Sequence, residues 1–197
     1  MISKKYKCIH VHINKTAGSS IETMLEYNDS GADHRTIHEY KDVLGEDIQK
    51  YFTFAFVRNP WDKMVSQFHH RKQNEKDKRI QQMDFKSWVK NIDDFHVIMG
   101  TGNQLNWLCD KKWVWHPGKK TYISNPTNFK VIVDYIGKFE NFSADWEKVC
   151  KKIGLTTETV HRRKSNHDDY RKYYDDESTQ IIFNRFEADI KFFKYKF

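Results

Sequence analysis

Two short segments of the sequence contain residues that commonly bind phosphate or sulfate. The first, KTAGSS, covers residues 15–20 and follows an apolar run. Gly18 would let the backbone approach an oxyanion closely, and Lys15 supplies a mobile positive charge. Three neighbouring hydroxyl groups can donate hydrogen bonds; they belong to Thr16, Ser19 and Ser20. Since a helix that follows such a turn adds unpaired N–H groups and a positive dipole end, the segment predicts an anion-binding loop.

The second segment, FVRNPWDKMVS, covers residues 56–66. Arg58 stands at the end of an apolar run, and Ser66 follows eight residues later, about two helical turns into the next expected helix. The guanidinium group offers a planar fork for a phosphate, and the serine can add a hydroxyl donor. A capping arginine and an incidental helical serine are the alternative interpretation.

The elements that would position both segments alternate along the chain. Apolar runs at residues 6–13 and 51–57 predict strands, each followed by apolar residues at helical spacing, and Pro60 suits the first turn of the second helix. Residues 130–135 predict a third strand. We therefore expect an α/β fold, a P-loop-like parallel β-sheet flanked by helices, in a single domain over residues 1–197. Ligands of such sheets bind at the carboxyl ends of the strands, where both segments lie.

Further helices are predicted by apolar spacing and capping residues. They cover residues 85–97, a segment from about Ser143, a good N-cap, to Ile153 before Gly154, and residues 175–193. The stretch from residue 101 to 128 is irregular and contains Trp107, Trp113, Trp115 and His116. These four could stack on a sugar ring as an acceptor lid or form the core of a loop, and the core interpretation is preferred.

The signature of nucleoside triphosphatases, G-x-x-x-x-G-K-[ST], is absent, because Lys15 precedes the glycine. No apolar strand ends in an evident magnesium-binding aspartate either. A P-loop-like kinase acting on a small molecule is weakened by these differences and stays open as the alternative function.

Together, KTAGSS and FVRNPWDKMVS resemble motifs of the sulfotransferases that use 3′-phosphoadenosine 5′-phosphosulfate (PAPS). They are similar in particular to the carbohydrate sulfotransferase-like family that is related to heparan sulfate 2-O-sulfotransferase. Two later segments strengthen this resemblance, YIGKFENF at residues 135–142 and the ending at residues 189–197. Lys63 stands where the family often has arginine.

The resemblance implies a function and roles for the site residues. The enzyme would transfer a sulfuryl group from PAPS to a hydroxyl or amine of an acceptor, a carbohydrate among the options, and release adenosine 3′,5′-bisphosphate without needing a metal. Lys15 would neutralise the bridging oxygen, and Arg58 and Ser66 would bind the 3′-phosphate. The loop residues would cradle the 5′-phosphate; they are Lys15, Thr16, Ala17, Gly18, Ser19 and Ser20.

A base must take the proton of the acceptor, and the segment between the two motifs contains candidates. The resemblance favours His34, and a histidine can accept a proton near neutral pH. His38 and Glu39 stay open, since related enzymes use a glutamate in this role. Residues 162–164, which are Arg162, Arg163 and Lys164, correspond to a loop that can close over the nucleotide in relatives, although such a basic run is more often a solvated face.

Composition limits the class of protein and its location. The net charge of +7 favours an anionic partner, but no nucleic-acid-binding motif accompanies it. No apolar stretch is long enough for a signal peptide or a membrane span. Three cysteines without paired spacing favour a reducing compartment, and the sequon Asn14-Lys15-Thr16 lies inside the predicted loop, where glycosylation would block it. We therefore expect a cytoplasmic protein. Neither the acceptor nor the oligomeric state follows from the sequence.

Overall fold

The structure is a computed structural model that describes residues 1–27, 33–74, 78–92, 102–110, 114–116, 121–123, 129–156 and 168–197. The chain forms two compact units. Unit 1 comprises Met1–Arg58, Gln104–Trp113 and Pro126–Lys164, and unit 2 comprises Asn59–Asn103, Val114–Asn125 and Ser165–Phe197. The expectation of one domain over residues 1–197 stays a prediction.

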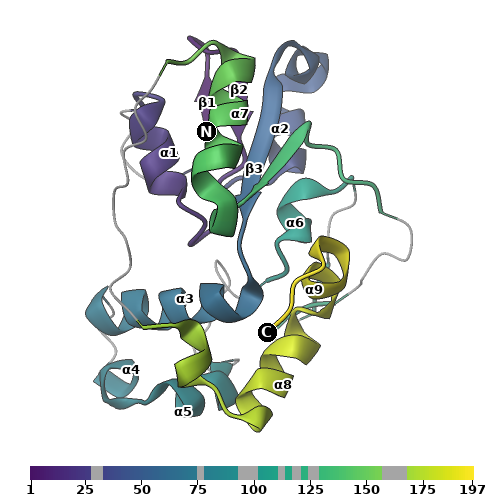
Figure 1. Cartoon of the computed structure of the whole chain (residues 1–197). Helices are drawn as coiled ribbons and strands as arrows, with labels where there is room; N and C mark the ends of the chain where they lie inside the picture. Colours follow the sequence, from purple (N-terminus) through teal and green to yellow (C-terminus); the bar gives the residue numbers. More distant parts are fainter. Residues whose placement is uncertain are drawn as a thin grey trace. The chain divides into compact units, whose positions relative to one another are not determined.

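Unit 1 contains the sheet, and its strands confirm the α/β class (Figure 1). The order is β1-β2-β3-β6, in which β2, β3 and β6 run parallel and β1 pairs with β2 in the antiparallel direction. The strands are β1 (Ile2–Ser3), β2 (Cys8–His10), β3 (Phe52–Val57) and β6 (Tyr135–Lys138). Because the three parallel strands end at one edge, the segments after His10, Val57 and Lys138 lie along that edge.

The third parallel strand lies later in the sequence than predicted. Val131 instead forms an antiparallel bridge with Cys109, and contact with β3 begins at Asp134, whose amide donates to the Thr53 carbonyl at 2.9 Å. The strand begins at Tyr135. In the residue before it, the Asp134 carboxylate accepts hydrogen bonds from the Thr53 amide at 2.7 Å and from the Thr53 hydroxyl at 2.8 Å. This side-chain contact fixes the register of β6 against β3.

Helices cover the sheet of unit 1 and bury its apolar side chains. α1 (Gly18–Met24) and α7 (Phe142–Ile153) share one core cluster with Phe54 and Phe56 of β3. Successive side chains of a strand point to opposite faces, so Ala55 and Val57 face the other side. There α2 (Ile37–Leu44) lies behind the sheet in Figure 1. Shorter elements of the unit are η1 (Gly45–Lys50), α6 (Leu105–Leu108) and η4 (Phe139–Asn141).

The ends of α7 agree only in part with the prediction. Gly154 ends the helix in the left-handed conformation at φ 70°, as expected. The N-cap is Asn141, two residues before the predicted Ser143, and it forms no side-chain cap bond. The carboxylate of Asp145, in the first turn, accepts instead from the Lys138 amide at 2.9 Å. That contact connects the helix start to the end of β6.

Unit 2 is mainly helical and has an aromatic core. α3 begins at Pro60, as predicted. The helix expected over residues 85–97 ends at Lys90, and the one expected over 175–193 breaks at Phe186. Phe186 is fully buried, so core packing holds the break without a glycine or proline. The elements are α3 (Pro60–Asn74), α4 (Lys78–Gln82), α5 (Phe85–Lys90), β4 (Val114–His116), β5 (Thr121–Ile123), η5 (Tyr170–Tyr173), α8 (Asp176–Arg185) and α9 (Glu187–Phe193).

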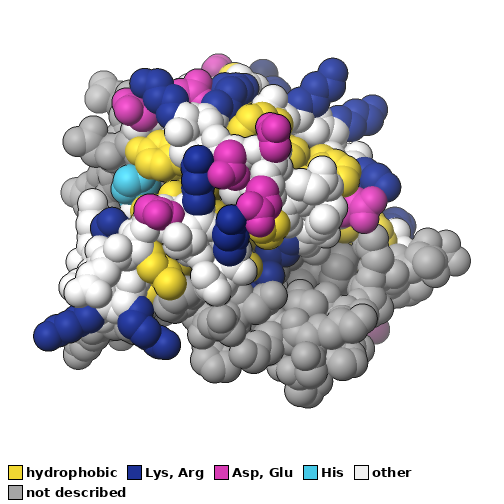
Figure 2. All heavy atoms as spheres, turned by 90° about the horizontal axis from the view of Figure 1, so that it is seen from below, with side chains coloured by type: hydrophobic (Ala, Val, Ile, Leu, Met, Phe, Trp, Pro, Cys, Tyr) yellow, Lys and Arg dark blue, Asp and Glu magenta, His cyan; other side chains and the backbone are white. Residues whose placement is uncertain are grey.

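Charges of both signs alternate on the face drawn in Figure 2, where Lys and Arg stand beside Asp and Glu. Two ion pairs of unit 2 join such charges: Lys90 lies 2.7 Å from Glu177, and Lys86 lies 3.2 Å from Asp175. None of the described helices combines the length and apolar character that a bilayer crossing requires.

Candidate active site

The predicted anion loop lies between β2 and α1, at the carboxyl edge of the sheet. Two of its residues that are not glycine have left-handed backbone conformations, Lys15 at φ 66° and Ala17 at φ 71°. Such conformations are uncommon for residues with a Cβ atom and cluster at functional sites. The Thr16 hydroxyl donates to the Ile13 carbonyl at 2.8 Å, so its hydrogen holds the loop together. Ser19 is exposed and Ser20 is buried.

Gly18 is needed for a reason that the sequence did not indicate. A Cβ atom at this position would lie 1.9 Å from both Cδ2 and Nε2 of the His12 ring. The loop therefore passes directly against the imidazole of His12, which lies between β2 and the loop. Alanine at this position would require the ring to move.

His12 is held from the opposite side by a buried carboxylate. Its Nδ1 lies 2.8 Å from Oε1 of Glu22, which projects from α1, and the two side chains are 5% and 11% exposed. Since a carboxylate only accepts, Nδ1 carries the hydrogen of this bond. The ring also stacks on His10, with centroids 5.4 Å apart, and lies tilted against His34, with centroids 4.3 Å apart.

His34, the predicted base, has a defined tautomer. Its Nδ1 lies 3.0 Å from the backbone carbonyl of His12. Because a carbonyl can only accept, Nδ1 is protonated in the neutral ring and Nε2 carries the lone pair. Burial lowers the pKa of His34 below its usual value of 6.5, which favours this neutral form. Trp107 is buried, as preferred for this residue, and its Nε1 donates to the His34 carbonyl at 3.0 Å.

The two alternative bases have different surroundings. Glu39 belongs to a capping box at the start of α2, where its Oε2 accepts from the Thr36 amide at 2.7 Å and its hydroxyl at 2.9 Å. His38 lies one position earlier on the same helix, with Nε2 buried and no hydrogen-bond partner among the described residues. His34 is therefore the candidate that contacts the residue before the anion loop.

Arg58 connects the end of β3 to the first loop. The residue is 4% exposed, its Nη1 donates to the Lys15 carbonyl at 3.1 Å, and its guanidinium group lies 4.1 Å from the centroid of the Phe139 ring. Gln104 accepts from the Arg58 amide at 2.8 Å and donates to its carbonyl at 2.9 Å. The structure thus brings two predicted site residues, Arg58 and Lys15, into direct contact.

The other half of the second segment belongs to unit 2. Ser66 is 2% exposed on α3, and Lys63 on the same helix is fully buried, with Nζ 5.6 Å from the centroid of the Phe186 ring. Arg58 ends unit 1, so the two residues assigned to the 3′-phosphate belong to different units. Their joint role stays a prediction.

Sequence reasoning missed three residues of this site. His12 and Glu22 are ten positions apart, and only the placement of His12 just before the loop could have drawn attention to it. Gln104 lies in a stretch without a pattern and meets Arg58 across 46 positions, so no local signal indicated it. Trp113 and residues 162–164 lie outside the described residues, and Trp115 and His116 belong to β4.

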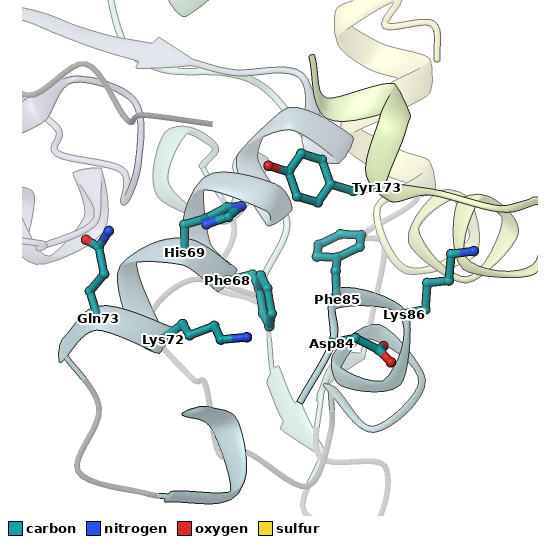
Figure 3. Close-up of a pocket in the computed structure, with 8 residues that line it drawn as sticks. All are labelled: Phe68, His69, Lys72, Gln73, Asp84, Phe85, Lys86 and Tyr173. Atoms are coloured by element: carbon teal, nitrogen blue, oxygen red, sulfur yellow. The ribbon is translucent and has the colours of Figure 1, made fainter. Parts of the chain in front are cut away.

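A pocket of about 740 Å³ lies in unit 2 (Figure 3). Phe68, Phe85 and Tyr173 form its aromatic wall, and Lys72 and Lys86 add positive charge. None of the predicted site residues lines it. Within the part of the chain that the structure describes, no group of three or more histidine, cysteine or acidic side chains is arranged to hold a metal ion.

Comparisons with known proteins show the family of the chain. A family model described as the sulfotransferase family matches residues 1–196. A protein of Archaeoglobus fulgidus, whose name states no function, is 36% identical over 123 residues, which cover 62% of this chain and 84% of the relative. No solved structure matches the chain. Since the family model spans nearly all residues, the chain belongs to the sulfotransferase family.

Proposed function

We propose that this sulfotransferase takes its sulfuryl group from PAPS and transfers it to a hydroxyl or amine, with a carbohydrate as one acceptor class. The observation that carries the proposal is the arrangement of His34 and the anion loop. The base donates Nδ1–H to the carbonyl of His12, and the ring of His12 lies against Gly18 of the loop. A proton acceptor and an anion-binding segment therefore share one anchoring residue.

In this mechanism the Nε2 lone pair of His34 takes the proton from the acceptor hydroxyl. The acceptor oxygen then forms a bond to sulfur, in line with the bond between sulfur and the bridging oxygen, which breaks. The electron pair of that bond goes to the bridging oxygen, where Lys15 neutralises the developing charge. The products are the sulfated acceptor and adenosine 3′,5′-bisphosphate, and the proton stays on His34.

The nucleotide would be held by both segments. Residues 15–20 would bind the 5′-phosphosulfate through backbone N–H groups and the hydroxyls of Ser19 and Ser20. The Thr16 hydroxyl donates to Ile13, so we assign this residue a contact through its backbone. Arg58 and Ser66 would bind the 3′-phosphate. Because the leaving group is already a phosphate, this chemistry does not need a metal ion, whereas the kinase alternative would need magnesium.

We also propose a cytoplasmic location, which rests on the cysteines. Cys8, Cys109 and Cys150 are all buried, and none of the three forms a disulfide bond. Burial raises the pKa of the Cys8 thiol to about 12, so this thiol stays protonated and unreactive. Buried free thiols are typical of proteins in reducing compartments.

The test is a thermal unfolding series with adenosine 3′,5′-bisphosphate, with and without a chelator. At a hundredfold excess over its dissociation constant, the ligand should add about 2.7 kcal/mol to the free energy of unfolding. A companion assay should detect transfer from labelled PAPS to a panel of acceptors as a mass shift of the product. An unchanged melting temperature at millimolar ligand, together with no transfer, would contradict the proposal. Activity that requires ATP as the donor and is lost when the chelator removes the metal ion would support the kinase.

A further inference from the structure

The pair formed by His12 and Glu22 is buried beside the loop and has no assigned role in the proposed reaction. The carboxylate of Glu22 belongs to α1, and the histidine it binds lies two residues after the end of β2. This bond connects the helix that follows the loop with the segment that precedes it. The contact therefore spans the loop, from a residue before it to the helix after it.

Two further contacts of His12 lead to the reacting groups. Its ring occupies the space in which a Cβ atom of Gly18 would lie, so the ring sets how closely the loop approaches the strand end. Its carbonyl accepts from Nδ1 of His34, and its ring lies 4.3 Å from the His34 ring, centroid to centroid. His12 thus contacts the loop and the base at the same time.

The loss of the bond to Glu22 would leave this arrangement without its anchor. The His12 ring could then rotate away from Gly18, and the backbone carbonyl that fixes the tautomer of His34 would gain freedom. Errors in position of about 1 Å can lower a reaction rate by about 10²-fold. The contacts from Glu22 to His12 and from His12 to His34 can therefore hold His34 at a fixed place beside the loop.

We propose that His12, anchored by Glu22, is a positioning residue that fixes the tautomer and the placement of His34 relative to the anion loop. This inference rests on the proposed function, because it assigns to His34 the role of base. It differs from a packing role, since it requires the hydrogen bond of His12 as well as the shape of its ring.

The first test reads the tautomer directly and needs no activity. In protein labelled with ¹⁵N-histidine, at a pH at which His34 is neutral, the ring shifts should show hydrogen on Nδ1 of His34. Glu22→Met, which keeps the length of the side chain but removes the acceptor, should produce a mixture of tautomers. Glu22→Gln keeps an acceptor oxygen and should retain the wild-type signals. Hydrogen on Nε2 of His34 in the wild type, or unchanged signals in Glu22→Met, would overturn the inference even if transfer is observed.

The second test is a double-mutant cycle with the base. Glu22→Met should lower the transfer rate by about 10- to 10²-fold, while the affinity for adenosine 3′,5′-bisphosphate changes by less than about threefold. In a His34→Ala background the same substitution should cost less than about threefold more, because residues that act through one another are not additive. Full additivity would mean that the pair acts independently of His34 and would contradict the inference.

Controls separate folding and packing from positioning. His12→Phe combined with Glu22→Met keeps a ring against Gly18 without the hydrogen bond; full activity in this variant would reduce the pair to packing and sink the proposal. His70→Gln, a substitution of an exposed histidine in unit 2, should change neither the tautomer nor the rate. If the wild type neither binds the bisphosphate nor transfers sulfate, the proposed function fails, and the tautomer measurement still decides the geometry.

Discussion

The two junctions at which a parallel strand leads into a helix are built in opposite ways. After β2, the chain passes through two left-handed residues, Lys15 and Ala17, before α1 begins. After β3, the next helix begins within three residues at Pro60, and the Trp61 amide donates to the Asn59 side chain at 3.1 Å. The first junction holds an unusual backbone, and the second uses favourable helix-start chemistry.

The two junctions differ in how much backbone strain they contain. Left-handed residues with a Cβ atom persist only where their surroundings hold them, and the first junction is held by several contacts. They come from the His12 ring, the Thr16 hydroxyl and the Arg58 guanidinium group. The second junction needs no such support. We therefore expect substitutions at the first to alter chemistry most and substitutions at the second to alter stability.

The largest effect is expected at Lys15, in the first junction. Lys15→Ala should lower the transfer rate by at least about 10²-fold, because the loss of one donor at a developing negative charge commonly costs this much. The affinity for adenosine 3′,5′-bisphosphate should change little, since the charge matters most as the bond to the bridging oxygen breaks. Lys4→Ala, at an exposed position of unit 1, serves as the matched control. A variant that keeps wild-type rates would remove Lys15 from the reaction.

An intermediate effect is expected at Arg58, which follows β3 and contacts Lys15 of the first junction. The wild type should bind adenosine 3′,5′-bisphosphate about tenfold to a hundredfold more tightly than adenosine 5′-monophosphate, and Arg58→Ala should remove most of this preference. Paired calorimetric titrations on both proteins measure it, with Arg171→Ala of η5 as the control. Equal weakening of both ligands would mean that Arg58 acts by holding the Lys15 carbonyl, the contact seen in the structure.

The smallest effect concerns the backbone alone. Ala17→Gly should raise the free energy of unfolding by about 0.5–1 kcal/mol, because glycine adopts φ 71° without a Cβ penalty. The same replacement at Ala144, which is exposed within α7, should lower it by about 1 kcal/mol. Urea titrations of the two variants test this opposite sign. A loss of stability in both would show that the first junction carries no strain at Ala17.

Local sequence patterns made the two junctions predictable. Features that depend on contacts between residues far apart in the sequence could not be predicted. The loop at residues 15–20 and the start of α3 at Pro60 follow from small residues and a proline directly after apolar runs. The register of β6 depends on Asp134, which bonds to Thr53 across 81 positions, and no local pattern records such a contact. Without a glycine or proline at Phe186, the break between α8 and α9 also had no sequence signal.

The candidate site shows the same division. Lys15, His34 and Arg58 could be named from the sequence because the resemblance places them in motifs, and the structure brings all three to one unit. Glu22 carries no motif and could only be found once α1 had folded against the strand end. The side chains to which we assign a role with the substrate are therefore more predictable here than those that we propose hold them in place.

The distribution of the three cysteines gives the molecule built-in probes of local opening. All three thiols lie in unit 1, in β2, next to α6 and in α7, and none belongs to unit 2. A buried thiol reacts with an alkylating reagent only when the structure around it opens, so the rate of labelling reports the opening free energy of its surroundings. The labelling rates of the native enzyme therefore report local opening of the sheet and its covering helices in unit 1, and unit 2 contributes no signal of its own.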